Sequence, residues 1–153
     1  MHPTAAALIR SLDLDPHPEG GHYRRTYASA RRVTDNAQAR PALTAIRFLL
    51  SAGDCSAWHR VDAEESWHWQ QGDALELLIY DESNRHLQRL ILDAAERGEP
   101  MQVVPAGCWQ AARSLGDFTL VGCTVSPGFV WEGFALLDLT SPLAAHLATL
   151  VPR

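Results

Sequence analysis

A histidine and a glutamate on neighbouring predicted strands are the residues of this chain best suited to chemistry. Side chains alternate across a strand, so His59 lies on one face of a predicted strand over 55–61. On the next predicted strand, over 64–70, Glu65 shares its face with two indoles, Trp67 and Trp69. If both faces turn inward, an imidazole and a carboxylate meet in an interior lined by tryptophan.

A histidine beside a carboxylate in a dry aromatic pocket suits general acid–base catalysis. The carboxylate fixes the tautomer of the imidazole and raises its basicity. Proton abstraction next to a carbonyl group is the reaction that needs the fewest additional groups. This reasoning predicts His59 as a catalytic base and Glu65 as its orienting partner, while a rival interpretation makes them a satisfied core pair.

The elements that must position these residues are short strands separated by turn residues. Strands are predicted near 22–28, 43–51, 55–61, 64–70, 74–81, 86–92, 101–104, 108–113, 117–125 and 130–138. Short helices are predicted over 4–12, with Thr4 as the cap, and over 141–150, where Ser141 precedes a proline. The pattern favours a sandwich or barrel over βαβ units, in one domain spanning residues 1–153.

The spacing of these residues resembles the first motif of the cupin superfamily. Gly53, His59, Glu65 and Gly72 stand at the motif's positions with the right gaps. Val61 stands where the motif has its second histidine.

The second cupin motif is present with a similar loss. Pro105-Ala106-Gly107 matches its start, but Gln110 stands at the position of its histidine. Val61 and Gln110 both stand at positions where the superfamily has a metal ligand.

More narrowly, the chain is similar to the small-cupin family known as DUF985 or Cupin_5, often described as sugar-epimerase-like. Departures from that family's pattern are Arg25, where an acidic residue is expected, and Arg47, where a tyrosine is expected. The shared motifs are His17-Pro18-Glu19-Gly20-Gly21, Tyr23-Arg24, Trp58-His59-Arg60-Val61, Glu65-x-Trp67-His68, Gly72-Asp73-x-Leu75-Glu76-Leu77, Val104-Pro105-Ala106-Gly107-x-Trp109-Gln110-Ala111 and Pro127-Gly128-Phe129.

The resemblance implies an all-β fold, a cupin-type double-stranded β-helix (jelly-roll) barrel with short N- and C-terminal helices. It also implies an isomerase or epimerase of the kind that works without a metal on deoxysugars, in which a histidine base faces a tyrosine acid. Tyr23, Tyr27 and Tyr80 are the candidates for that acid, and Tyr23 is preferred because it follows the Gly-Gly turn. Cupins of this kind usually pair, so a homodimer is expected.

A metal cofactor is disfavoured by the count of ligands. A metal-dependent cupin needs about three or four nitrogen or oxygen ligands around one ion. Valine cannot coordinate, and a glutamine amide is a weak ligand, so His59 and Glu65 would hold a metal poorly. His68 would add a ligand only if a bulge turned it inward.

Further residues are predicted to bind a small-molecule substrate. Gln110 would donate a hydrogen bond to it, and the indoles Trp67, Trp69 and Trp109 would stack on a sugar or a planar ring. His68 joins them on the same strand. The segment 17–22 is either a simple turn or a lid whose Glu19, or the following Arg24, reaches the mouth of the barrel.

Composition excludes several other classes of protein. The chain has 153 residues and a formal net charge of −5, which argues against nucleic-acid binding. No segment approaches the roughly 20 apolar residues that span a bilayer, so no membrane partner is expected. Three scattered cysteines suggest reduced thiols and a cytoplasmic location. The alternatives to an epimerase are a non-catalytic small-molecule binding protein and a metal-dependent enzyme of the same fold.

Overall fold

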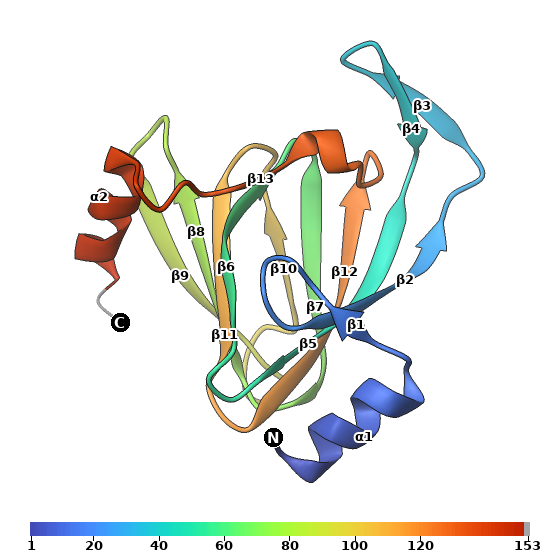
Figure 1. The fold of residues 1–153 in the computed structure, drawn as a ribbon, viewed down its shortest axis with the longest axis vertical. Coiled ribbons are helices and arrows are strands. Elements are labelled where there is room, and N and C mark those ends of the chain that lie inside the picture. Colours follow the sequence, from blue (N-terminus) through green and yellow to red (C-terminus); the bar gives the residue numbers. More distant parts are fainter. Residues whose placement is uncertain (152–153) are drawn as a thin grey trace.

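The computed structural model describes residues 1–151, in which two antiparallel sheets lie face to face (Figure 1). The six-stranded sheet has the order β1 (Asp15–Pro16), β2 (His22–Ala28), β5 (Thr44–Ser51), β12 (Phe118–Ser126), β7 (Glu64–Gly72) and β10 (Met101–Val104). The five-stranded sheet has the order β13 (Phe134–Leu136), β6 (Cys55–Val61), β11 (Trp109–Ser114), β8 (Leu75–Asp81) and β9 (His86–Leu92). Every predicted strand has an observed counterpart, and residues 152–153 of the expected domain lie outside the described residues.

Two segments differ from the sequence-based expectation. A hairpin of β3 (Arg32–Asp35) and β4 (Gln38–Pro41) extends away from the sheets (Figure 1). Its turn at Asn36 and Ala37 has positive φ at both residues but lacks the glycine that usually marks such a turn. The predicted strand over 130–138 is instead a 3-10 turn, Trp131–Gly133, followed by the three residues of β13.

The two predicted helices are present and cover the outer faces of the sheets. Helix α1 (Pro3–Ser11) is capped by His2 instead of Thr4, and its Ala5 packs with Leu49 and Leu120 behind the six-stranded sheet. Helix α2 (Pro142–Leu150) covers the other sheet through contacts of Leu147 with Tyr80 and Trp109, and Ser141 caps it as predicted. No helix within residues 1–151 is long and apolar enough to cross a membrane.

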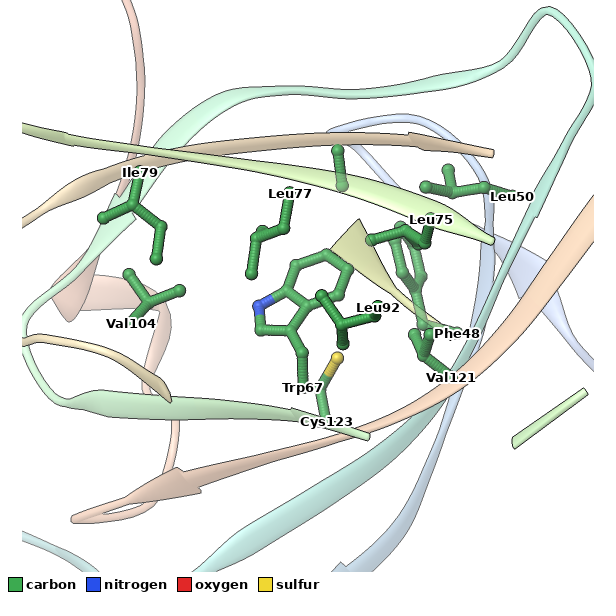
Figure 2. Close-up of a cluster of buried hydrophobic side chains, with 11 residues drawn as sticks. Phe48, Leu50, Trp67, Leu75, Leu77, Ile79, Leu92, Val104, Val121 and Cys123 are labelled. Atoms are coloured by element: carbon green, nitrogen blue, oxygen red, sulfur yellow. The ribbon is translucent and has the colours of Figure 1, made fainter. Parts of the chain in front are cut away.

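The inward-facing positions change character along the strands, and this change creates the site. On β5, Phe48 and Leu50 are core residues, whereas Thr44 and Ile46 line a cavity. On β7, Trp67 lies at the centre of the core among Leu75, Leu77, Leu92 and Cys123 (Figure 2), whereas Glu65, two residues earlier, lines the cavity. One end of the space between the sheets is therefore packed, and the other end is hollow.

A buried arginine ties the projecting hairpin to the loops above that hollow end. Arg40, on β4, is 1% exposed and donates through Nε to the carbonyl oxygen of Gly128 at 2.7 Å. Its two terminal nitrogens donate to the two carboxylate oxygens of Asp62, each at 3.0 Å. Planar, two-point pairing of this kind is the strong form of a charge-assisted hydrogen bond.

Replacing this arginine should therefore destabilise the fold. Arg40→Met would remove four hydrogen bonds, one of them a long contact with Asp35, and leave the partly exposed Asp62 unpaired, so we expect a loss of about 2 kcal/mol in the free energy of unfolding. Arg31→Met, at an exposed position nearby, serves as the control and should change stability by less than about 0.5 kcal/mol. Equal urea midpoints for the two variants would contradict a structural role for Arg40.

Candidate functional site

A cavity of about 480 Å³ occupies the hollow end of the space between the sheets. Its polar lining includes His17, Glu19, Tyr23, His59 and Glu65. Its apolar wall includes three rings in mutual contact, Phe129, Trp131 and Phe134, with centroid separations of 4.9 to 5.8 Å. A largely apolar hollow with a few convergent polar groups is the usual form of a small-molecule site.

The tight loop between β1 and β2 delivers Glu19 into this cavity. The backbone N–H of Gly20 donates to the carbonyl of His17, and that of Ala57 on β6 donates to the carbonyl of Glu19. Gly20 has a φ of +106°, and a Cβ at this position would collide with the carbonyl oxygen of Cys55. The loop is thus a fixed wall of the cavity, which favours the simple turn over the lid among the two alternatives for this segment.

The imidazole of His59 is buried against the carboxylate of Glu19. His59 Nε2 lies 2.9 Å from Glu19 Oε2, and the two side chains are 2% and 7% exposed. His59 Nδ1 lies 2.7 Å from the carbonyl oxygen of Ala57. The predicted partner of His59 was Glu65, so the assignment of the orienting carboxylate is corrected to Glu19.

These two contacts require an extra proton in the pair. A backbone carbonyl only accepts, so Nδ1 of His59 must carry hydrogen and donate it. The contact between Nε2 and a carboxylate oxygen then needs a second proton, shared by His59 and Glu19. Burial acts to lower the pKa of His59, but Glu19, Glu65 and the Ala57 carbonyl outweigh it, and the pKa is raised. The raised pKa favours the charged form of His59, paired with the Glu19 carboxylate.

Glu65 is held by a relay of hydrogen bonds that starts in the core. Trp67 Nε1 donates to Gln110 Oε1 at 2.8 Å, which fixes the orientation of the amide. Gln110 Nε2 then donates to Glu65 Oε1 at 2.9 Å. Gln110 is 1% exposed and is not among the residues that line the cavity, so it orients Glu65 instead of donating to a substrate there, which corrects its predicted role.

Burial sets the acidity of Glu65. It raises the pKa of this carboxyl from 4.5 to about 7, and Glu19 acts in the same direction, while His59 and the bond from Gln110 oppose the shift. The second oxygen, Oε2, accepts no hydrogen bond from residues 1–151. Glu65 is thus a carboxyl with one uncommitted oxygen in the cavity and a pKa near neutrality.

Of the three candidate tyrosines, Tyr23 alone lines the cavity. Its ring stands edge-on to that of His17, with the centroids 4.4 Å apart. Tyr27 is 55% exposed at the surface, and Tyr80 is buried beneath α2 on the outer face of the other sheet. Tyr23 therefore stays the candidate for the acid, and its role remains a prediction.

None of the three predicted substrate-binding indoles lines the cavity, and Trp109 packs against α2 on the outer face of the five-stranded sheet. Trp67 is part of the core described above. Trp69 donates through Nε1 to the carbonyl of Asp73 at 3.1 Å and carries the guanidinium of Arg97 over its ring. Its place further along β7 than Trp67 puts it at the packed end of the interior.

His68 and Arg24 also lie away from the cavity. Strand alternation turns His68 to the opposite face from Glu65, with no bulge between them on β7, so it adds no ligand there. Arg24 forms an ion pair with Asp13 on the surface. The neighbouring Arg25 lines the cavity instead, and its guanidinium contacts the carbonyl of Phe129 at 3.4 Å.

The sequence-based prediction missed His17 and the aromatic wall as parts of the site. His17 begins the His-Pro-Glu-Gly-Gly motif, so its position beside Glu19 was the available signal. Phe129 follows the Pro127-Gly128 pair, whereas Trp131 and Phe134 stand in a segment predicted as an ordinary strand. Their convergence depends on how this loop folds back over the cavity.

The residues present do not fit the metal that the cupin resemblance implies. Val61 offers no donor atom, and the amide of Gln110 and both nitrogens of His59 are already hydrogen-bonded. Cys123 also lines the cavity, but burial and nearby carboxylates raise the pKa of its thiol well above its ordinary value. Among residues 1–151, no three His, Cys, Asp or Glu side chains are grouped so that they could hold a metal ion.

Comparison with known families and structures gives consistent results. A family model described as the cupin superfamily (DUF985) matches residues 6–137. A hypothetical protein from Leishmania major is 31% identical with a TM-score of 0.82, and the match covers 97% of this chain and 92% of that one. A protein from Shewanella oneidensis is 35% identical with a TM-score of 0.83, covering 95% of this chain and 94% of that one.

More distant structures share the fold. A variant of oxalate decarboxylase from Bacillus subtilis is 17% identical with a TM-score of 0.60, covering 91% of this chain and 35% of that one. At this identity the likeness shows the fold alone, and it confirms the expected jelly roll. No curated protein matches the chain.

The role of Gly20 in placing Glu19 can be tested with a pair of glycine variants. Gly20→Ala adds a Cβ that collides with backbone, so the loop must move, whereas Gly53→Ala adds one with no atom within 4 Å. Both glycines have positive φ, and an alanine in this conformation alone costs about 1 kcal/mol in the free energy of unfolding. Thermal unfolding should show Gly53→Ala losing only that amount and Gly20→Ala losing at least twice as much. Equal losses would mean that the loop is not fixed.

The pKa of Glu65 predicts how stability depends on pH. The folded chain holds this proton more tightly than the unfolded chain, in which a glutamate has its ordinary pKa of 4.5. The resulting stabilisation is full below pH 4.5 and is lost as the pH rises through about 7, on the order of 3 kcal/mol at most.

Glu65→Gln removes this titration and keeps the shape of the side chain. Urea unfolding between pH 4.5 and 8 should show the wild type losing more stability than the variant over this range. Glu64→Gln, at the exposed position next to it, is the control and should follow the wild type. Parallel curves for Glu65→Gln and wild type would contradict a raised pKa.

Proposed function

We propose that this chain, which belongs to the DUF985 family of the cupin superfamily, is an isomerase or epimerase that moves a proton on a small polar, sugar-like molecule. The observation that carries the proposal is Glu65, buried in a closed-ended cavity with one carboxylate oxygen uncommitted. A group with a pKa near the working pH is present in both protonation states and can take up and release a proton. Glu65, with a pKa of about 7, meets this condition.

In this proposal the proton-transfer role passes from His59 to Glu65. Both nitrogens of His59 already face acceptors, Ala57 and Glu19, so its ring has no lone pair for a substrate proton. Its positive charge acts through space, opposing the rise in the pKa of Glu65 caused by burial. His59 and Glu19 are therefore positioning residues that tune Glu65.

The proposed reaction is abstraction of a proton from a carbon next to a carbonyl group. Glu65 takes the proton from one face of the carbon, and Gln110 holds the carboxylate in place during the transfer. Tyr23 provides a hydroxyl in the same cavity for a second proton transfer, which inversion at carbon requires. Positioned acid–base groups of this kind typically contribute 10²–10⁴-fold to a rate.

A second candidate function is non-catalytic binding of a small molecule. The three contacting rings Phe129, Trp131 and Phe134, with Arg25 beside them, support it because they would hold a ligand without any change in its bonds. The two candidates differ in whether the ligand exchanges a carbon-bound hydrogen.

Exchange with solvent deuterium separates them. Aldoses, ketoses and their deoxy and phosphorylated forms are incubated with the protein in D₂O, and deuterium next to the carbonyl is followed by proton NMR. Wild type should catalyse exchange on at least one compound, and Glu65→Gln should reduce the rate by about 10²-fold or more. Glu64→Gln should retain it, since this neighbour is exposed on the other face of β7.

Two results would count against catalysis by Glu65. Exchange at the wild-type rate in Glu65→Gln would remove this residue from the mechanism. A compound that binds in the cavity and is recovered without deuterium would favour the binding protein.

A further inference from the structure

The ring of His17 is a part of the cavity to which the proposed chemistry gives no role. Its side chain is 7% exposed, and it lies among the rings of Tyr23, Phe48, Trp131 and Phe134 at centroid distances of 4.4 to 6.3 Å. It lines the same cavity as Glu65. A polar ring in such surroundings must satisfy its two nitrogens within the protein or through a bound molecule.

The backbone fixes the tautomer of His17. The N–H of Glu19 donates to Nδ1 of His17 at 3.1 Å. Nδ1 therefore carries a lone pair, and the single proton of a neutral ring must lie on Nε2. A doubly protonated ring would lose this bond, and it would place a second cation beside His59. Burial and the charge of His59 lower the pKa of His17, against the opposing influence of Glu19, in agreement with a neutral ring.

The Nε2–H group of His17 has no acceptor within residues 1–151. This nitrogen is not among the fully buried side-chain atoms that lack a partner, and His17 lines the cavity, so the group is reached from the cavity. Nδ1 is held by the loop and the ring is enclosed by aromatic side chains, so the group cannot turn to another partner without breaking that bond. The arrangement therefore presents one oriented, neutral N–H donor to whatever occupies the cavity.

We infer that His17 binds the carbonyl oxygen of the substrate through Nε2–H, so that the substrate is an aldehyde or ketone that passes through an enolate. This inference rests on the proposed function of Glu65 and names the chemical class on which that residue acts. A neutral imidazole is suited to this task because it polarises a carbonyl while keeping its own proton. The aromatic surroundings strengthen the interaction by excluding water.

The step balances within the cavity. The Glu65 carboxylate takes the proton from the carbon next to the carbonyl, and the electrons of that C–H bond form the new carbon–carbon double bond. The carbonyl π electrons move to the oxygen, and the negative charge that develops there is stabilised by His17 Nε2–H. Reprotonation at carbon by Glu65 returns the carbonyl and leaves the protein unchanged. When Tyr23 donates from another side instead, Glu65 is left protonated and Tyr23 is left as a phenolate, and a proton passes from Glu65 to Tyr23 through solvent before the next turnover.

Two substitutions separate the two nitrogens of His17. His17→Asn keeps an acceptor near the position of Nδ1 for the N–H of Glu19 but has no donor at the position of Nε2. His17→Gln places an amide nitrogen near Nε2 and loses the acceptor. If His17 only supports the loop, His17→Asn should reduce the rate of deuterium exchange less than His17→Gln does. If His17 binds a carbonyl oxygen, His17→Gln should reduce this rate less than His17→Asn does. We expect His17→Asn to lose about 100-fold in deuterium exchange and His17→Gln to lose less than tenfold.

Binding of acetohydroxamate, a planar analogue of an enediolate, provides a measurement that does not need turnover. Wild type and Glu65→Gln should both bind it, His17→Gln should bind it within a few-fold, and His17→Asn should bind it at least tenfold more weakly. Nitrogen-15 NMR of the histidine rings at pH 7 should show the Nε2–H tautomer for His17 and a shift of this signal on binding.

The outcomes distinguish the two proposals. An Nδ1–H or doubly protonated His17, no binding of acetohydroxamate by wild type, or equal affinities in His17→Asn and His17→Gln would overturn the role of His17. Binding that depends on His17, together with exchange that is unaffected by Glu65→Gln, would retain the oxygen site and overturn the role of Glu65.

Discussion

The contact between His59 and Glu19 is the interaction on which the rest of the site depends. Two carboxylates and an imidazole are buried at one end of the interior, where isolated charges are costly. Pairing His59 with Glu19 neutralises one carboxylate and uses both nitrogens of the ring. The second carboxylate, Glu65, is left without an ion-pair partner of its own, and its pKa rises to about 7. One pairing therefore decides which group in the cavity can exchange protons.

The surrounding structure keeps His59 paired with Glu19 and leaves Glu65 without an ion-pair partner. The glycine-rich loop holds Glu19 against His59 through backbone hydrogen bonds to β6, while the core indole Trp67 orients Gln110 and, through it, Glu65. Arg40 anchors the loop that carries the aromatic wall by bonding the carbonyl of Gly128. The two residues that replace cupin metal ligands therefore have different roles in this structure. Val61 contributes apolar lining, and Gln110 becomes the link between the core and the candidate acid–base group.

The fold was predictable from the sequence because it depends on local patterns. Alternating apolar residues, turn residues and the spacing of Gly53, His59, Glu65 and Gly72 locate the strands and the jelly roll, and each predicted strand has an observed counterpart. The pairing within the site was not predictable. Glu19 meets His59 from forty residues away, across a loop whose course depends on positive φ at Gly20. The hairpin of β3 and β4 was missed because its turn residues, Asn36 and Ala37, lack the usual glycine.

The most direct test of the central claim is the titration of the Glu65 carboxyl carbon by carbon-13 NMR in the intact protein. The burial of Glu65 beside the His59–Glu19 pair predicts a midpoint near pH 7. A midpoint for Glu65 near 4.5 would contradict the division of roles among the three side chains, and with it the assignment of Glu65 as the proton-transfer group.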